Sequence, residues 1–165
     1  MRPGELRKAK WKEINFEKAE WGFVASKTRP QLIVPLSRQV IAILRKLHQV
    51  TGSSPYVFPS ARSDKRPMSE NAVLYALRSL GIPKETMTGH GFRATFRTIG
   101  DEVLKLRVDL IEHQLAHKVK DSNGRAYNRT AFLADRKLLM QEWSDYLDHL
   151  RGGASGELIE FQRRA

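Results

Sequence analysis

The chain has 165 residues, a length that suits one domain and is short for two. Its 29 lysines and arginines outnumber 18 acidic residues, and the net charge of +11 indicates a polyanionic partner such as nucleic acid. An anionic membrane is the weaker alternative, because no stretch approaches the roughly 18 apolar residues of a spanning helix. The absence of cysteine excludes a disulfide framework and Cys-type zinc or redox sites, and makes a reducing cytoplasm the expected location.

Three short segments near the start of the chain are rich in β-branched and aromatic residues. They cover residues 11–16, 21–26 and 32–36, and the turn-like sequences Glu17-Lys-Ala and Thr28-Arg-Pro30 separate them. Short strands with turns between them are typical of antiparallel pairing. We therefore expect a small three-stranded antiparallel sheet.

The rest of the chain is predicted to be mainly helical. Ser37 is a natural N-cap before apolar residues at helical spacing that end by Thr51-Gly52, and a second helix is expected from Ser69 to Gly81. Its inward positions are expected to be Val73, Leu74, Leu77 and Leu80. Exposed loops are expected at 53–55 and 59–67, and further helices at 91–105, 108–116, 124–128 and 131–150. The predicted fold class is mainly α with a small three-stranded antiparallel sheet (α+β).

Most of the aromatic residues are predicted to pack in the interior. The tryptophans Trp11, Trp21 and Trp143 lie on amphipathic patterns, which favours core packing over stacking on bases. Three tyrosines sit beside apolar residues at core-like spacing and are given the same interpretation: Tyr56, Tyr75 and Tyr146.

The sequence Thr88-Gly-His90-Gly-Phe-Arg93 contains a histidine and an arginine three residues apart. On a helix these side chains share one face and can meet one ligand. Glycines allow close approach of the backbone, and a helix N-terminus adds partial positive charge, so an anion site is reasonable here. The competing interpretation is that His90 caps a helix and Arg93 is a solvated surface charge.

Two further histidines, His113 and His117, have the spacing of a zinc-binding helix. The sequence between them lacks the glutamate that acts as general base in such helices, and no third ligand is evident. The acidic residues also form no cluster suited to Mg²⁺. His117 acting as a hydrogen-bond donor to phosphate needs no metal, and we favour that role.

Tyr127 differs from the other tyrosines because its surroundings are basic and contain few apolar residues. Lys118, Lys120, Arg125 and Arg129 surround it in the sequence. A phenol attacks phosphate poorly at neutral pH unless cations stabilise the charge on the phosphate and a group accepts its proton. The order Arg2, Lys27, His90, Arg93, His117 and Tyr127 supplies cations, proton donors and a nucleophile.

In this order, the residues resemble the catalytic domain of the tyrosine recombinases, in particular the phage-type and genomic-island integrases. The resemblance covers nearly the whole chain, although Met1 replaces the small residue and glycine that the family usually has before its first arginine. The matching motifs are Arg2-Pro-Gly-Glu-Leu-Arg7, Lys27 before Ile33-Val-Pro-Leu-Ser37, Thr88-Gly-His90-Gly-Phe-Arg93-Ala-Thr95, Leu115-Ala-His117 and Ala126-Tyr127-Asn-Arg129.

The resemblance implies a transesterification that uses no metal or other cofactor. Arg2, Arg93 and His117 would bind the scissile phosphate, and Tyr127 would attack it to leave a 3′-phosphotyrosine and a free 5′-hydroxyl. Lys27 would protonate the departing oxygen, and His90 would assist proton transfer or organise the pocket. The implied partners are double-stranded DNA, a synaptic tetramer of the full-length protein, and accessory DNA-bending or excision factors, with no membrane.

Two alternatives stay open at this point. A type IB topoisomerase-like enzyme would cleave and reseal one strand with nearly the same residues. A catalytically incompetent DNA-binding module is the other, since a truncation close to Arg2 would let that arginine fray. We expect residues 1–150 to form the catalytic domain, lacking upstream DNA-binding domains, and residues 151–165 to form a flexible or partner-binding tail.

Overall fold

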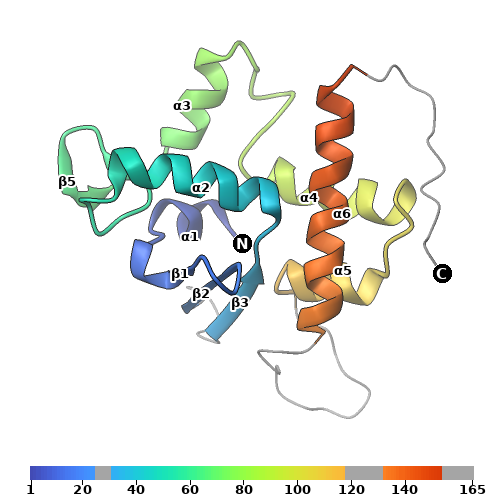
Figure 1. Ribbon diagram of the computed structural model, residues 1–165. Coiled ribbons are helices and arrows are strands. Elements are labelled where there is room, and N and C mark those ends of the chain that lie inside the picture. Colours follow the sequence, from blue (N-terminus) through green and yellow to red (C-terminus); the bar gives the residue numbers. More distant parts are fainter. Residues whose placement is uncertain (25–30, 118–131, 154–165) are drawn as a thin grey trace.

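The computed structural model describes residues 1–24, 31–117 and 132–153, and in these ranges the chain is mainly helical with a small antiparallel sheet, as predicted (Figure 1). None of the helices in the described ranges is long and apolar enough to cross a membrane. The elements are α1 (Pro3–Arg7), a 3-10 turn (Trp11–Glu13), β1 (Ile14–Asn15), β2 (Glu20–Val24), β3 (Gln31–Pro35), α2 (Arg38–Thr51), β4 (Pro59–Ser60), β5 (Ser63–Pro67), α3 (Ala72–Ser79), α4 (Gly91–Glu102), α5 (Val108–Gln114) and α6 (Leu133–Arg151).

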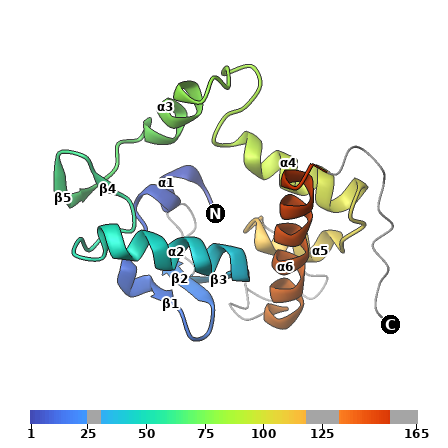
Figure 2. The ribbon, with the colours of Figure 1, turned by 45° about the horizontal axis from the view of Figure 1, so that its top comes forward.

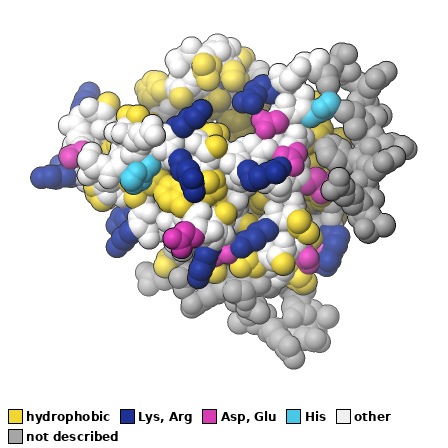
Figure 3. Space-filling model, viewed as in Figure 1, with side chains coloured by type: hydrophobic (Ala, Val, Ile, Leu, Met, Phe, Trp, Pro, Cys, Tyr) yellow, Lys and Arg dark blue, Asp and Glu magenta, His cyan; other side chains and the backbone are white. Residues whose placement is uncertain are grey.

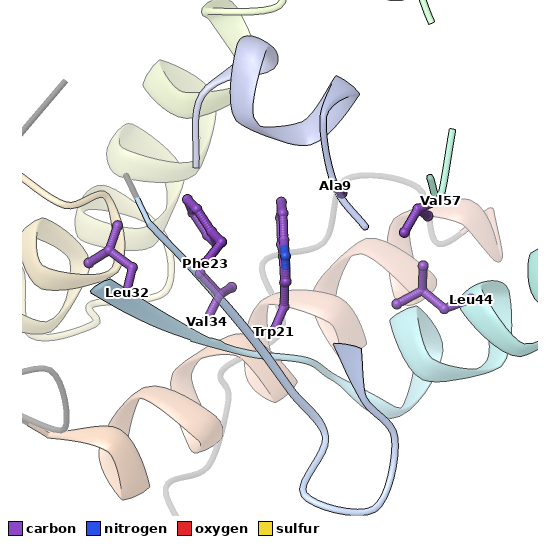
Figure 4. Packing of buried hydrophobic residues seen from close by; sticks show 7 residues of the cluster. All are labelled: Ala9, Trp21, Phe23, Leu32, Val34, Leu44 and Val57. Atoms are coloured by element: carbon purple, nitrogen blue, oxygen red, sulfur yellow. The ribbon is translucent and has the colours of Figure 1, made fainter. Parts of the chain in front are cut away.

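The first core is built on the three-stranded sheet, whose order is β1-β2-β3. Trp21 pairs with Val34 and Phe23 with Leu32, so all four side chains stand on the same face. Figure 4 shows Trp21 and Phe23 side by side on this face, with Leu44 and Val57 facing each other beyond them. Trp21 is only 3% exposed, which confirms its predicted core position.

The second core lies among α4, α5 and α6. Its centre is Ile111, which is 0% exposed, and the Phe96 ring packs edge-on against Trp143 with ring centres 5.1 Å apart. A Cβ atom at Gly100 would lie 3.1 Å from Cδ1 of Ile111, so the glycine lets α4 approach α5 closely. The apolar spacing of three short helices therefore produces one shared interior.

Polar contacts join the two cores where α6 meets α2 and β3. The Ser144 hydroxyl donates to the Ser37 Oγ at 2.7 Å, and the Gln39 amide donates to Asp145 Oδ1 at 2.7 Å. The buried Arg136 guanidinium donates to Gln114 Oε1 at 3.0 Å and to the Ile33 carbonyl. Figures 1 and 2 both show α6 beside the start of α2.

Several predicted elements differ from the structure. Residues 59–67, predicted as a loop, contain the hairpin β4–β5, and residues 11–16 form a 3-10 turn followed by a two-residue strand. In α3 only Leu77 is buried, whereas Leu80 is 76% and Tyr75 71% exposed. Leu74 is also exposed, at 36%. The interior positions predicted for Leu74, Tyr75 and Leu80 were wrong because helical spacing identifies a face without showing what covers it. The helix predicted at 124–128 lies outside the described residues.

Ser37 generates a stability prediction, because its buried Oγ caps α2 through the Val40 N–H and also accepts from Ser144. We expect Ser37→Ala to lower the free energy of unfolding by about 1–3 kcal/mol, since it removes the cap and leaves a buried hydroxyl without its acceptor. Urea denaturation measures this change in the free energy of unfolding. Ser79→Ala is the control, because the Ser79 hydroxyl is exposed and bonds only within its own helix. Equal losses in the two variants would contradict the role given to Ser37.

Candidate active site

Arg93 is the centre of the candidate site. It lies in the first turn of α4, and its guanidinium reaches three acceptors on distant parts of the chain. Nη1 donates to the Met1 carbonyl at 2.8 Å, while Nη2 donates to the Leu115 carbonyl at 2.7 Å and lies 3.0 Å from His117 Nε2. A guanidinium has five N–H donors, so two remain for an incoming anion after these described contacts. The structure therefore brings two of the predicted site residues, Arg93 and His117, into contact.

The start of α1 supplies the second arginine. Arg2 is the N-cap of this helix, and the buried Glu5 carboxylate accepts from the Arg2 backbone N–H at 2.6 Å and lies 3.7 Å from its Nη1. A Cβ atom at Gly89 would lie 2.9 Å from the Pro3 ring, so α1 approaches the segment before α4 closely. Arg2 is thus held in place by Glu5 and by the packing of Pro3, rather than frayed.

His117 reaches Arg93 because of the way α5 ends. The His117 N–H donates to the Glu112 carbonyl and the Ala116 N–H to the His113 carbonyl, which together form a Schellman motif. Ala116 adopts the left-handed conformation this motif requires, with φ of 55°. The turn folds the chain back, and His117 Nδ1 then bonds Glu112 Oε2. The His113 ring packs against Phe132, with ring centres 5.2 Å apart.

The electrostatics of the site favour binding of an anion. The pKa of Arg93 is lowered from its usual value, mainly by burial and then by the positive charge of Arg2, while Glu5 and Glu112 oppose the shift. The guanidinium stays charged, because even a lowered arginine pKa is far above neutral pH. A bound phosphate would offset the repulsion between the two arginines.

Arg2 and Arg93 line the same cavity, whose volume is about 320 Å³. Figure 3 shows a recess with hydrophobic walls below α3, and Lys and Arg side chains spread over the same face. The other lining residues are mostly apolar and come from α1, β3 and α3 to α6: Met1, Pro3, Leu6, Val34, Val73, Gly89, Phe92, Phe96, Gln114, Leu115, Met140 and Trp143. Apolar walls lower the local dielectric and strengthen the field of the two guanidinium groups.

Three predicted site residues remain: His90, Lys27 and Tyr127. His90 is at the N-cap position of α4 and is exposed, with no side-chain hydrogen bond to the helix end, so the structure does not support the competing interpretation that its side chain caps the helix. Lys27 and Tyr127 lie outside the described residues. Within the described ranges, no group of three or more His, Asp or Glu side chains is arranged to hold a metal ion.

Two acidic residues of the site were missed by sequence reasoning. Glu5 could have been found, because Arg2 and Glu5 have the i, i+3 spacing of a reciprocal helix cap. Glu112 gave no such signal, since a residue five positions before His117 does not share its face on a regular helix. Only the left-handed turn at Ala116 brings the two side chains into contact.

Comparison with known proteins gives a consistent match. The phage integrase family matches residues 1–133, a range that includes both Lys27 and Tyr127. Prophage integrase IntZ of Escherichia coli K12 is 39% identical over 96% of this chain and 39% of its own length, and the integrase of Enterobacteria phage P4 is 37% identical over 90% of this chain and 37% of its own length. The chain thus spans about two fifths of the curated relatives it matches.

Among solved structures, the crystal structure of XerA recombinase is similar, with a TM-score of 0.60 and 15% sequence identity. The similarity covers 94% of this chain and 54% of that one. At this identity the comparison concerns the fold, and it agrees with the predicted class of a mainly helical domain with a small sheet.

Arg93→Lys tests the anion site. A lysine keeps the charge, but its single nitrogen cannot span two carbonyls and a histidine and still present two donors to an anion. We expect binding of inorganic phosphate, followed by NMR titration at constant ionic strength, to weaken about tenfold or more, which corresponds to about 1.4 kcal/mol. Arg38→Lys on the exposed side of α2 is the control. Equal affinities for both variants would place Arg93 outside the anion site.

Proposed function

Because the chain belongs to the phage integrase family, we propose that it forms the catalytic part of a site-specific DNA recombinase that works through a covalent bond to Tyr127. The observation that carries this proposal is the pairing of Arg2 and Arg93 in one cavity, with His117 bonded to the second arginine. Two guanidinium groups match the charge that develops on a phosphodiester during substitution. Their planar donors suit two phosphate oxygens at a time.

In the proposed reaction the Tyr127 hydroxyl oxygen attacks phosphorus while a general base accepts its proton, and the bond from phosphorus to the 5′ oxygen breaks. A 3′-phosphotyrosine and a free 5′-hydroxyl result. Lys27 supplies the proton to the departing 5′ oxygen, and His90 assists proton transfer or organises the phosphate pocket. The 5′-hydroxyl of another strand then attacks the phosphotyrosine and releases Tyr127, so each step exchanges one phosphate ester for another and needs no ATP.

The proposed partners follow from the same chemistry. Double-stranded DNA is the substrate, and the net charge of +11 provides attraction to its phosphates. Exchange between two duplexes needs four nucleophiles, which a synaptic tetramer of the longer protein would supply, with accessory DNA-bending or excision factors. The proposed location is the bacterial cytoplasm, with the protein associated with the nucleoid when it is bound to DNA.

A type IB topoisomerase-like reaction would use the same attack by tyrosine but would reseal the original strand. The family match and the named relatives, which are integrases, favour recombination. A recombinase joins strands from two different duplexes, whereas a topoisomerase-like enzyme only relaxes a supercoiled plasmid, so a strand-joining assay distinguishes the two. A DNA-binding module without activity would neither join strands nor relax the plasmid, and it would form no covalent adduct with DNA.

Tyr127→Phe tests the nucleophile. The phenylalanine keeps the ring and removes the attacking oxygen, so we expect no covalent protein–DNA adduct on a nicked suicide duplex that carries the attachment site. Adducts are measured by denaturing gel electrophoresis. Tyr75→Phe is the matched control, because Tyr75 is 71% exposed on α3 and should give adduct at the unmodified rate. An adduct formed at the normal rate by Tyr127→Phe would exclude Tyr127 as the nucleophile.

Lys27→Ala tests the proton donor through the leaving group. We expect cleavage of an ordinary duplex to fall about 10²–10⁴-fold, the usual contribution of a general acid. A substrate with sulfur in place of the departing 5′ oxygen should restore the rate to within about tenfold of the unmodified chain, because a thiol with a pKa of about 8.5 leaves without a proton. A defect of the same size on both substrates would assign Lys27 a different role.

A further inference from the structure

Glu112 lies behind His117 and has contacts on both carboxylate oxygens. Oε2 bonds Nδ1 of His117, and Oε1 accepts from Arg97 Nε at 3.0 Å. Arg97 in turn donates to Asp101 Oδ2 at 3.2 Å, so the network continues along α4 away from the site. The Glu112 side chain is 22% exposed and that of His117 46%, which means that the carboxylate is the better shielded of the two groups.

These contacts define which ring nitrogen of His117 carries its proton. A carboxylate accepts hydrogen bonds, so Nδ1 must be the protonated nitrogen of the neutral ring. Nε2 then has a lone pair, and it lies 3.0 Å from Arg93 Nη2, a group that only donates. In the opposite tautomer, the Nε2–H of His117 would face the N–H donor of Arg93. The unprotonated Nδ1 would then face the Glu112 carboxylate, so two acceptors would oppose each other.

From this geometry we propose that Glu112 is a positioning residue of the reaction: it sets the tautomer and ring orientation of His117 and, through Nε2, the direction of the Arg93 guanidinium. This inference rests on the proposed function, in which Arg93 binds the scissile phosphate. With Nδ1–H donated to Glu112 and Nε2 accepting from Arg93, His117 acts on the phosphate through Arg93 and not as the direct donor that the sequence predicts. A carboxylate behind a histidine serves the same purpose in other enzymes, where its replacement leaves the ring in place with the wrong nitrogen protonated.

Among the described residues, the charged groups in this network come from two helices and from the start of the chain. Arg93 from α4 and Glu112 from α5 contact His117, Arg97 from α4 contacts Glu112, and Arg2 acts on Arg93 from the N-cap of α1. Among these described groups, Glu112 is the carboxylate in contact with the imidazole. A purely structural interpretation is that Glu112 only ties α5 to α4 through Arg97, and the two interpretations predict different results for Glu112→Gln.

Glu112→Gln keeps the side-chain volume but leaves one oxygen facing two donors, Arg97 Nε–H and His117 Nδ1–H. The amide nitrogen must oppose one of them. We expect the ring ¹⁵N shifts of His117, measured by NMR without DNA, to move away from the Nδ1–H tautomer. Adduct formation on the suicide duplex should fall about 10- to 100-fold, by analogy with other groups that orient a functional histidine.

A second variant provides a rescue. When Arg97→Ala is combined with Glu112→Gln, the single amide oxygen is free to turn toward His117, so the Nδ1–H tautomer and most of the adduct formation should return. If Glu112 only linked α5 to α4 through Arg97, the double variant should form less adduct than Glu112→Gln alone, because it lacks both partners of that contact. Glu112→Asp, whose carboxylate still has two acceptor oxygens, should retain the tautomer.

Asp109→Asn is the matched control, since it neutralises a carboxylate on the same helix that pairs with Arg107. It should change neither the tautomer nor adduct formation. An unchanged tautomer in Glu112→Gln, or a double variant no better than the single one, would overturn the proposal. The tautomer is measured without DNA, so its result does not depend on the proposed function. If the unmodified chain forms no adduct at Tyr127, the proposed function is refuted. The NMR measurement then still decides whether Glu112 sets the tautomer of His117.

Discussion

The arrangement of the site depends on the Arg93 guanidinium. A charged group that is partly buried must find acceptors, and Arg93 finds them in the Met1 carbonyl, the Leu115 carbonyl and His117. Met1 and Arg93 are 92 positions apart in the sequence. The planar fork of one side chain thereby holds the start of α1 and the end of α5 at one edge of α4, with the cavity between them.

The site lies where the two hydrophobic cores meet, and hydrogen bonds hold much of this junction. Ser37, Gln39 and Ser144 join α2 to α6, and Arg136 joins α6 to α5 and β3. In the described part of the chain, no buried side-chain nitrogen or oxygen lacks a hydrogen-bond partner. Such contacts have preferred directions, whereas apolar packing tolerates sliding, so a satisfied polar junction defines the relative position of the two cores more sharply than burial alone.

Two carboxylates, Glu5 and Glu112, balance the cations of the site, and neither lines the cavity. Glu5 holds Arg2, and Glu112 holds His117 and Arg97. Each acid offsets part of the repulsion between cations that would otherwise oppose folding, and both oppose the lowering of the Arg93 pKa. Arg2 and Arg93 line the cavity, where a phosphodiester would bring the compensating negative charge. This division of roles is the physical basis of the proposed transesterification.

The sequence by itself determined the features that depend on neighbouring residues. The Ser37 cap with its apolar spacing predicted α2, the segments rich in β-branched and aromatic residues predicted β2 and β3, and the spacing of His90 and Arg93 predicted an anion site at the start of a helix. Tertiary structure alone decided which surfaces are covered, as Tyr75 and Leu80 show, and which distant groups meet, as Arg93 with Met1 and Glu112 with His117 show. Local spacing specifies the direction in which a side chain points, but its partner depends on packing between elements and on single backbone turns such as that at Ala116.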